Sequence, residues 1–309
     1  HHPRAETNAI TSSSRTINRM KEDMRKQLGL DERSVGIPVK KMVPPSEGTS
    51  VQQKSDPIVL VENGGFAYGR NSILESVEMK IKDGEFWCFI GPNGEGKTTF
   101  IKALLGALRP KRGLIRLRAD FARRTRIGFV PQSCDLNPSV PTTIESFVKQ
   151  GTAGLNVERT KLNHRVRRAL EVMGIQFIRE RSIWRVSGGQ RQRAMVARAL
   201  VRDPLMMIVD EPTAGLDLAA SSGLLKTITE LNQKHKITVI FVTHDLQLAG
   251  RYASHVAIFK NKRVINGPIG EILTGKNLEK AFGVPTEVKQ TSSGEYTVRS
   301  KVEFQEASV

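Results

Sequence analysis

A glycine-rich segment between an apolar run and a helical run constrains the fold more than any other feature of the sequence. Residues 91–99 read GPNGEGKTT, after the apolar run 85–90 and before the helical run 100–108. The pattern GxxxxGK[ST] between a strand and a helix is typical of a phosphate-binding loop, because its backbone N–H groups and the helix N-terminus converge on a phosphate. Lys97 can bridge the β- and γ-phosphates of a nucleotide, and the Thr98 hydroxyl is placed to bind Mg²⁺. The expected phosphate-binding residues are Gly91, Pro92, Asn93, Gly94, Glu95, Gly96, Lys97, Thr98 and Thr99.

Short apolar runs alternate with helical patterns through most of the chain. This rhythm is typical of an α/β fold with a wound sheet. The even spacing of Tyr296, Val298, Val302 and Phe304 predicts a final strand or hairpin around Ser293 and Gly294. The expected strands are 58–61, 85–90, 127–130, 205–209, 238–242 and 255–259, and two expected helices are 159–170 and 189–202.

One apolar run ends in two adjacent carboxylates. Residues 205–212 read LMMIVDEP, so Asp210 and Glu211 follow a predicted buried strand. Asp210 can hold a magnesium ion, and Glu211 can orient or deprotonate an attacking water. A capped core strand is the alternative interpretation, but a phosphate-binding loop requires such an acidic partner.

The N-terminal segment differs in composition from the rest of the chain. Residues 1–56 are poor in large apolar side chains, which predicts a mobile arm, and His1 and His2 resemble the remnant of an affinity tag. A short helix over 17–28 could contact a partner or membrane, although a weakly ordered tail is the simpler interpretation. No stretch approaches the roughly 18 apolar residues of a membrane span. Cys88 and Cys134 lack metal-ligand spacing, which favours a reducing compartment.

The chain is strongly basic, with a formal net charge of +17. Arginine and lysine are concentrated in 109–126 and 159–193. Such an excess indicates either an anionic partner, such as lipid headgroups or nucleic acid, or a solvated charged face. Aromatic residues are not interleaved with these cations, so neither interpretation is favoured.

A third motif makes the pattern specific. Residues 186–190 read VSGGQ and open the helix before the acidic strand, and they resemble the LSGGQ signature of ABC (ATP-binding cassette) ATPases. The resemblance covers residues 58–285 and implies a P-loop NTPase-type wound sheet with an antiparallel β portion. It also implies an α-helical insertion at about 135–190 in a nucleotide-binding domain of residues 57–285, followed by a short β extension at 286–309.

The resemblance also implies roles for individual residues. Tyr68 matches the ring that stacks on adenine, and Gln132, Asp217 and His244 match the magnesium- and water-sensing glutamine, the D-loop aspartate and the switch histidine. The implied catalytic residues are Glu211, His244, Gln132 and Lys97, and the implied Mg²⁺ ligands are Thr98, Gln132 and Asp210. In the family, Ser187, Gly188, Gly189 and Gln190 act on ATP bound to a second copy, so complete sites form only in a dimer.

Two positions depart from the family pattern. Glu95 replaces a small or neutral residue of the loop, and its charge should lower nucleotide affinity unless the side chain points outward. Val186 replaces leucine, which is a minor apolar exchange.

The likeness extends to ATPases of bacterial importers for zinc, manganese, iron chelates, haem or cobalamin. It rests on a short Arg-rich hairpin before 127–132, on 140–148, and on the endings 270–274 and 278–285. It implies transmembrane permease subunits and a substrate-binding protein as partners, at the cytoplasmic face of a bacterial inner membrane. A lipid-trafficking or export ATPase is the alternative, and a nucleic-acid or ribosome-associated protein is less favoured because the chain has one cassette and no long heptads.

Overall fold

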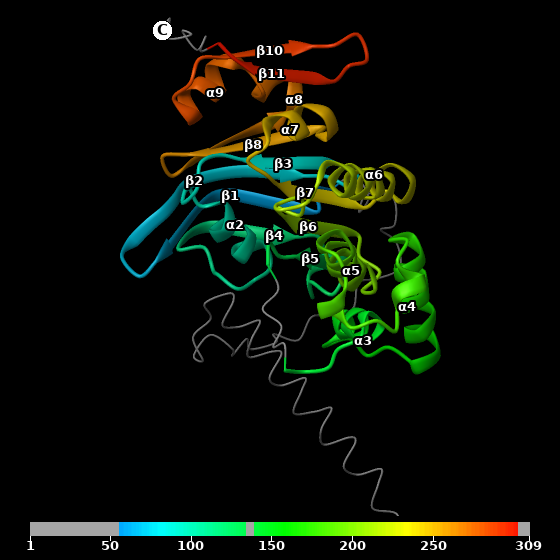
Figure 1. The fold of residues 1–309 in the computed structure, drawn as a ribbon. Coiled ribbons are helices and arrows are strands. Elements are labelled where there is room, and N and C mark those ends of the chain that lie inside the picture. Colours follow the sequence, from blue (N-terminus) through cyan, green and yellow to red (C-terminus); the bar gives the residue numbers. More distant parts are fainter. Residues whose placement is uncertain (1–55, 134–138, 302–309) are drawn as a thin grey trace, which may run out of the picture. The chain divides into compact units, whose positions relative to one another are not determined.

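The computed structural model describes residues 56–133 and 139–301 (Figure 1). Residues 1–55 of the predicted arm lie outside the described residues, and so do Cys134, Val302 and Phe304. Within the described ranges, no helix combines the length and apolar character needed to cross a membrane.

A six-stranded sheet forms the centre of the fold. Its order is β5-β6-β7-β3-β8-β9, and all neighbouring strands are parallel except β8 and β9. The five residues of β3 and of β7 are all buried, as expected for strands covered on both faces. The strands are β3 (Phe86–Ile90), β5 (Ile127–Val130), β6 (Met206–Asp210), β7 (Thr238–Val242), β8 (His255–Lys260) and β9 (Arg263–Pro268).

Alternate residues of β3 face two different hydrophobic cores. Phe86, Cys88 and Ile90 pack with the helices that follow β5 along the chain. Trp87 and Phe89 pack with α2 (Lys97–Leu104) and with a second sheet. This two-residue alternation is the geometry of any β-strand, and it places the central sheet between two apolar layers.

The second sheet is antiparallel, with the order β2-β1-β4. Its strands are β1 (Val59–Tyr68), β2 (Asn71–Ile81) and β4 (Arg112–Leu117). It is the expected antiparallel portion. Residues 109–126, however, do not form the predicted hairpin. Strand β4 pairs with β1 whereas β5 pairs with β6, so this segment passes from one sheet to the other.

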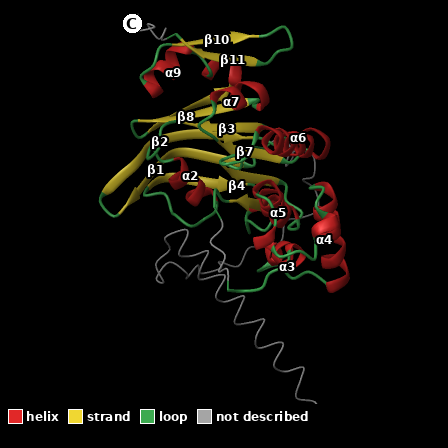
Figure 2. Cartoon of the chain, in the orientation of Figure 1, coloured by secondary structure: helices red, strands yellow, loops and turns green. Residues whose placement is uncertain are grey.

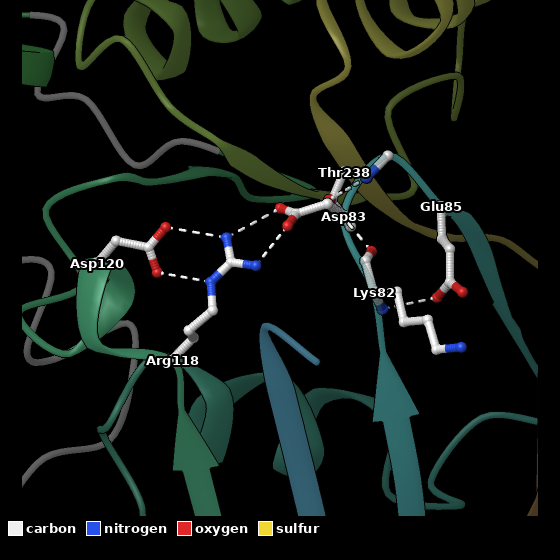
Figure 3. A network of polar contacts seen from close by, with 7 residues as sticks. Lys82, Asp83, Glu85, Arg118, Asp120 and Thr238 are labelled. Carbon is white, nitrogen blue, oxygen red and sulfur yellow. Dashed lines mark hydrogen bonds and ion pairs between the residues drawn. The ribbon is translucent and has the colours of Figure 1, made fainter. Parts of the chain in front are cut away.

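Arg118 ties the two sheets together directly after β4 (Figure 3). Its Nε donates to Asp120 Oδ1 at 2.9 Å and its Nη2 donates to Asp83 Oδ1 at 3.1 Å. Asp83 lies in the turn between β2 and β3, and the next residue, Gly84, donates its N–H to Thr238 Oγ1 of β7 at 2.9 Å. Part of the basic excess therefore serves contacts within the fold and is not solvated charge.

The helical insertion lies between β5 and β6 in the sequence. Figure 2 shows α3 (Ile144–Lys149), α4 (Arg159–Val172) and α5 (Gly188–Leu200) grouped together. Val166, Ala169 and Leu170 form the buried stripe of α4, at the spacing of one helix face. Together with the two sheets, this insertion confirms the predicted fold class.

The remaining elements follow β6 and complete the fold. They are α6 (Leu218–His235), α7 (Leu246–Tyr252), α8 (Ile269–Ile272), α9 (Gly275–Phe282), β10 (Thr286–Gln290) and β11 (Tyr296–Ser300). Strands β10 and β11 are antiparallel neighbours, which confirms the predicted hairpin around Ser293 and Gly294.

Candidate functional site

The phosphate-binding loop connects β3 to α2 in a conformation that requires glycine. Gly91, Gly94 and Gly96 have φ angles of 142°, 83° and 97°. A Cβ atom on Gly91 would lie 2.3 Å from the carbonyl oxygen of Phe259, so the loop packs directly on the end of β8. Gly96 is the N-cap of α2, and no side chain caps this helix. The N–H groups of its first turn are therefore available to an anion.

Lys97 lies across the concave side of this loop. Its Nζ donates to the carbonyl oxygens of Gly91 at 2.6 Å and of Pro92 at 2.8 Å, and the residue is 8% exposed. Burial lowers the pKa of Lys97, while the carboxylates of Glu211 and Asp210 act in the opposite direction. A buried cation held by two backbone carbonyl oxygens, next to the uncapped N-terminus of α2, is suited to bind a phosphate.

Asp210 and Glu211 stand at the carboxyl end of β6, as the sequence predicts. Burial, together with the neighbouring Glu211, raises the pKa of Asp210 to about 6. Glu211 has a φ angle of 43°, a backbone conformation that residues other than glycine rarely adopt. Its N–H donates to the carbonyl oxygen of Val242 at the end of β7 at 3.0 Å, which fixes the backbone in this position.

Three predicted catalytic residues meet at the Glu211 carboxylate. Gln132 Nε2 donates to Glu211 Oε2 at 3.1 Å, and His244 Nδ1 lies 3.4 Å from Glu211 Oε1. Gln132, Glu211 and His244 follow β5, β6 and β7, which are neighbouring parallel strands whose carboxyl ends share one edge of the sheet. Their convergence is therefore a consequence of the strand order.

These residues line a cavity of about 470 Å³ together with the start of the phosphate-binding loop. A carboxylate with two oriented neighbours beside a phosphate loop can position a water molecule for attack on a phosphoryl group. The sequence interpretation missed one lining residue, Phe282 at the end of α9, because nothing in its spacing indicates that this late helix reaches the cavity. The lining residues are Gly91, Pro92, Asn93, Gln132, Glu211, His244 and Phe282.

The expected Mg²⁺ ligands present oxygen donors. Thr98 is exposed at the first turn of α2, whereas Thr99 is buried. Threonine hydroxyl, aspartate carboxylate and amide oxygens are hard donors of the kind that Mg²⁺ prefers. In the part of the chain that the structure describes, no three His, Cys, Asp or Glu side chains are arranged so that they could hold a metal ion. A cage built only from such side chains is thus not formed there, and the donor set fits an ion that keeps water and phosphate ligands.

Tyr68 lies at the end of β1, outside the cavity. The residue is 42% exposed, and Lys102 Nζ lies 5.7 Å from the ring centroid. An exposed flat ring can stack on a base without reading its edges.

The signature residues also lie outside the cavity. Ser187 caps α5 by accepting from Gln190 N at 3.2 Å, and Gln190 Oε1 accepts from Ser187 N at 3.1 Å. The helix start is exposed at Ser187 and Gly188. Asp217 caps α6 by accepting from Ala220 N at 2.8 Å. The structure therefore brings Lys97, Gln132, Glu211 and His244 toward one site and leaves the signature elsewhere on the chain.

Comparisons with known proteins identify the family. A family model described as ABC transporter matches residues 74–214. The zinc uptake system ATP-binding protein ZurA of Listeria innocua is 36% identical over 217 residues, which are 67% of this chain and 84% of that protein. The manganese transport system ATP-binding protein MntB of Bacillus subtilis is 33% identical over 231 residues, 73% of this chain and 92% of that protein.

Solved structures give the same result. A transporter described as a metal-chelate type ABC transporter in an inward-facing conformation matches with a TM-score of 0.71 and 26% identity, over 81% of this chain and 99% of that chain. CbiO1 of Clostridium perfringens, part of the ABC transporter complex CbiONQ, matches with a TM-score of 0.64 and 30% identity, over 74% and 97%. From its sequence, its fold and its phosphate-binding loop, this chain belongs to the ABC transporter family, as an ATP-binding and ATP-hydrolysing subunit.

Proposed function

We propose that this ATPase powers the import of a metal ion or a metal chelate by partner membrane subunits. The names of its relatives support this cargo class, since they refer to zinc uptake, manganese transport and a metal-chelate type transporter. Transmembrane permease subunits and a substrate-binding protein are the proposed partners. The chain acts as a peripheral subunit at the cytoplasmic face of the membrane, as in a bacterial inner membrane.

The observation that carries the catalytic proposal is the Glu211 carboxylate between Gln132 and His244. Glu211 orients the attacking water or accepts its proton. Gln132 and His244 hold the carboxylate and the water in line with the γ-phosphate, and Lys97 stabilises negative charge on the phosphate oxygens.

The same site holds the nucleotide. Residues of the loop 91–99 other than Pro92 donate backbone N–H groups to the phosphates, and Tyr68 stacks on the adenine. Thr98, Gln132 and Asp210 are the residues that would hold Mg²⁺. When bound, Mg²⁺ neutralises charge on the phosphate oxygens.

A second copy of the chain completes each site. The start of α5 is exposed, and Ser187, Gly188, Gly189 and Gln190 do not line the cavity around Glu211. In a head-to-tail pair, the N-terminus of α5 would face the triphosphate bound to the partner copy. Asp217 would lie near it in the dimer interface. Closing of the pair on ATP is then the motion that drives the membrane subunits.

Reconstitution tests the cargo. The chain would be purified with the membrane subunits that accompany it and placed in proteoliposomes with the substrate-binding protein. Zinc, manganese or a metal chelate should stimulate ATP hydrolysis and accumulate in the lumen, and a complex carrying Glu211→Gln should accumulate none. Stimulation by anionic lipid and by no metal would contradict import and support the lipid-trafficking alternative.

A further inference from the structure

The unusual carboxylate of the phosphate-binding loop has two partners at one turn of the chain. Glu95 Oε2 accepts the backbone N–H of Asn261 at 2.7 Å, and Glu95 Oε1 lies 3.0 Å from Lys260 Nζ. Lys260 ends β8 and Asn261 begins the turn to β9. The side chain of Glu95 is 19% exposed and that of Lys260 is 35% exposed, so the pair is partly shielded from water. Glu95 is therefore directed to this turn and satisfied there.

The turn that receives Glu95 is itself held in place. Its other residue, Lys262, accepts the N–H of Glu75 in β2 through its carbonyl oxygen at 2.7 Å, and Lys262 Nζ lies 3.6 Å from Glu75 Oε1. Phe259, just before the turn, is the residue whose carbonyl oxygen closely approaches Gly91. The end of β8 thus supports the phosphate-binding loop at Gly91, and the following turn supports it at Glu95.

The opposite charges of Glu95 and Lys260 also bear on phosphate binding. A carboxylate within a loop that receives phosphates would repel them, and Glu95 is close enough to Lys97 to act on the pKa of that amine. Lys260 supplies the compensating positive charge at 3.0 Å. An ordinary surface ion pair contributes little, but this pair lies between a ligand-binding loop and a fixed turn.

We propose that Glu95 is a positioning residue, which together with Lys260 forms a latch between the phosphate-binding loop and the β8–β9 turn. The latch holds the loop backbone in its phosphate-accepting shape and removes the electrostatic penalty of the Glu95 carboxylate. This inference rests on the proposed role of the loop in binding ATP.

A double-mutant cycle on the full-length chain tests the latch. Lys260→Met should weaken ATP binding on the order of tenfold, because it leaves the Glu95 charge uncompensated beside the phosphates. Glu95→Gln keeps an acceptor for the Asn261 N–H and removes the charge, so it should bind ATP several-fold more tightly than Lys260→Met. The Glu95→Gln/Lys260→Met double variant should recover most of the loss caused by Lys260→Met. A merely structural role of Lys260 would not produce this recovery.

Three further measurements decide the outcome. Lys234→Met removes the same cation from a more exposed ion pair with Glu230, within the last turns of α6, and should bind ATP like wild type. Glu95→Ala should speed amide hydrogen exchange at 93–96, whereas Lys234→Met should not.

Lys97→Ala reports on the site itself. If Lys97→Ala loses ATP binding while Lys260→Met keeps wild-type affinity, or if the double variant binds as weakly as Lys260→Met, the latch is wrong and the site stands. If Lys97→Ala binds ATP like wild type, the assignment of the site fails, and the latch fails with it.

Discussion

The two glycine-rich helix N-termini at α2 and α5 differ in how their backbone N–H groups are capped. At α2, the N-cap is Gly96 in a left-handed conformation with no side-chain cap, and the buried Lys97 amine faces into the loop. At α5, Ser187 and Gln190 cap each other's backbone N–H groups in a closed capping box. Both ends carry a positive helix dipole, but only α2 leaves its first-turn donors free of side chains and adds a cation.

This difference indicates a division of labour. The α2 end can bind phosphate within one chain, because the loop is packed against β8 and beside the catalytic carboxylate. The α5 end is closed by its own capping box, and in the proposed dimer it contacts ATP only when a second copy brings the triphosphate to it. Variants at the two ends should therefore affect binding and turnover differently.

The largest effect is expected at the carboxylate on the α2 side. Glu211→Gln should lower ATP hydrolysis by about 10²- to 10⁴-fold, because the amide cannot accept a proton from water. ATP affinity should remain close to wild type, and ATP should then trap a dimer. Phosphate release, equilibrium binding and size-exclusion chromatography with ATP measure these effects. Wild-type turnover in the variant would remove Glu211 from its proposed role.

The second contrast separates binding from turnover. Lys97→Ala should lose hydrolysis and also weaken ATP binding by tenfold or more, on the order expected for losing a charged phosphate contact. Ser187→Arg should lose hydrolysis but keep the ATP affinity of a single chain, because its lesion lies outside the cavity. Equal losses of ATP affinity in both variants would contradict the division of labour.

The smallest effect concerns the caps. Ser187→Ala and Thr143→Ala each remove an N-cap, at α5 and at α3, and each should cost about 1 kcal/mol of unfolding free energy. Only Ser187→Ala should reduce ATP turnover as well, because Thr143 has no proposed contact with nucleotide. Denaturant unfolding and phosphate release provide the comparison. Equal turnover in the two variants would reduce Ser187 to a structural cap.

The parts of the site that were predictable from the sequence follow apolar strands. Gln132, Glu211 and His244 each lie two residues after the end of such a run, and the phosphate-binding loop has a local pattern of its own. Their mutual contacts depend on the strand order β5-β6-β7, which no local pattern encodes.

Other features depend on contacts between residues that are distant in the sequence, so they were either not predicted or predicted wrongly. Glu95 meets Asn261 across 166 residues of sequence, so its direction could not be read from the loop. An arginine-rich hairpin was expected before residue 127, but β4 pairs with the distant β1 and β5 pairs with β6. Phe282 reaches the cavity only through the path of α9. Long-range contacts of this kind are set by packing of the whole domain and not by local propensity.

The central claim is that each ATP site draws Lys97 from one copy and Ser187 from the other, and two covalently linked dimers test it most directly. One joins a Lys97→Ala half to a Ser187→Arg half, and the other joins a wild-type half to a half with both substitutions. The two dimers carry the same lesions, so differences in stability or expression cannot explain a difference in activity. A third linked dimer, with Ser187→Arg in one half only, establishes that one intact site supports hydrolysis.

We predict that the first dimer hydrolyses ATP, because one of its composite sites is intact, and that the second does not, because each of its sites carries one lesion. Activity in the second dimer and none in the first would contradict the account and place both residues of a site on the same chain.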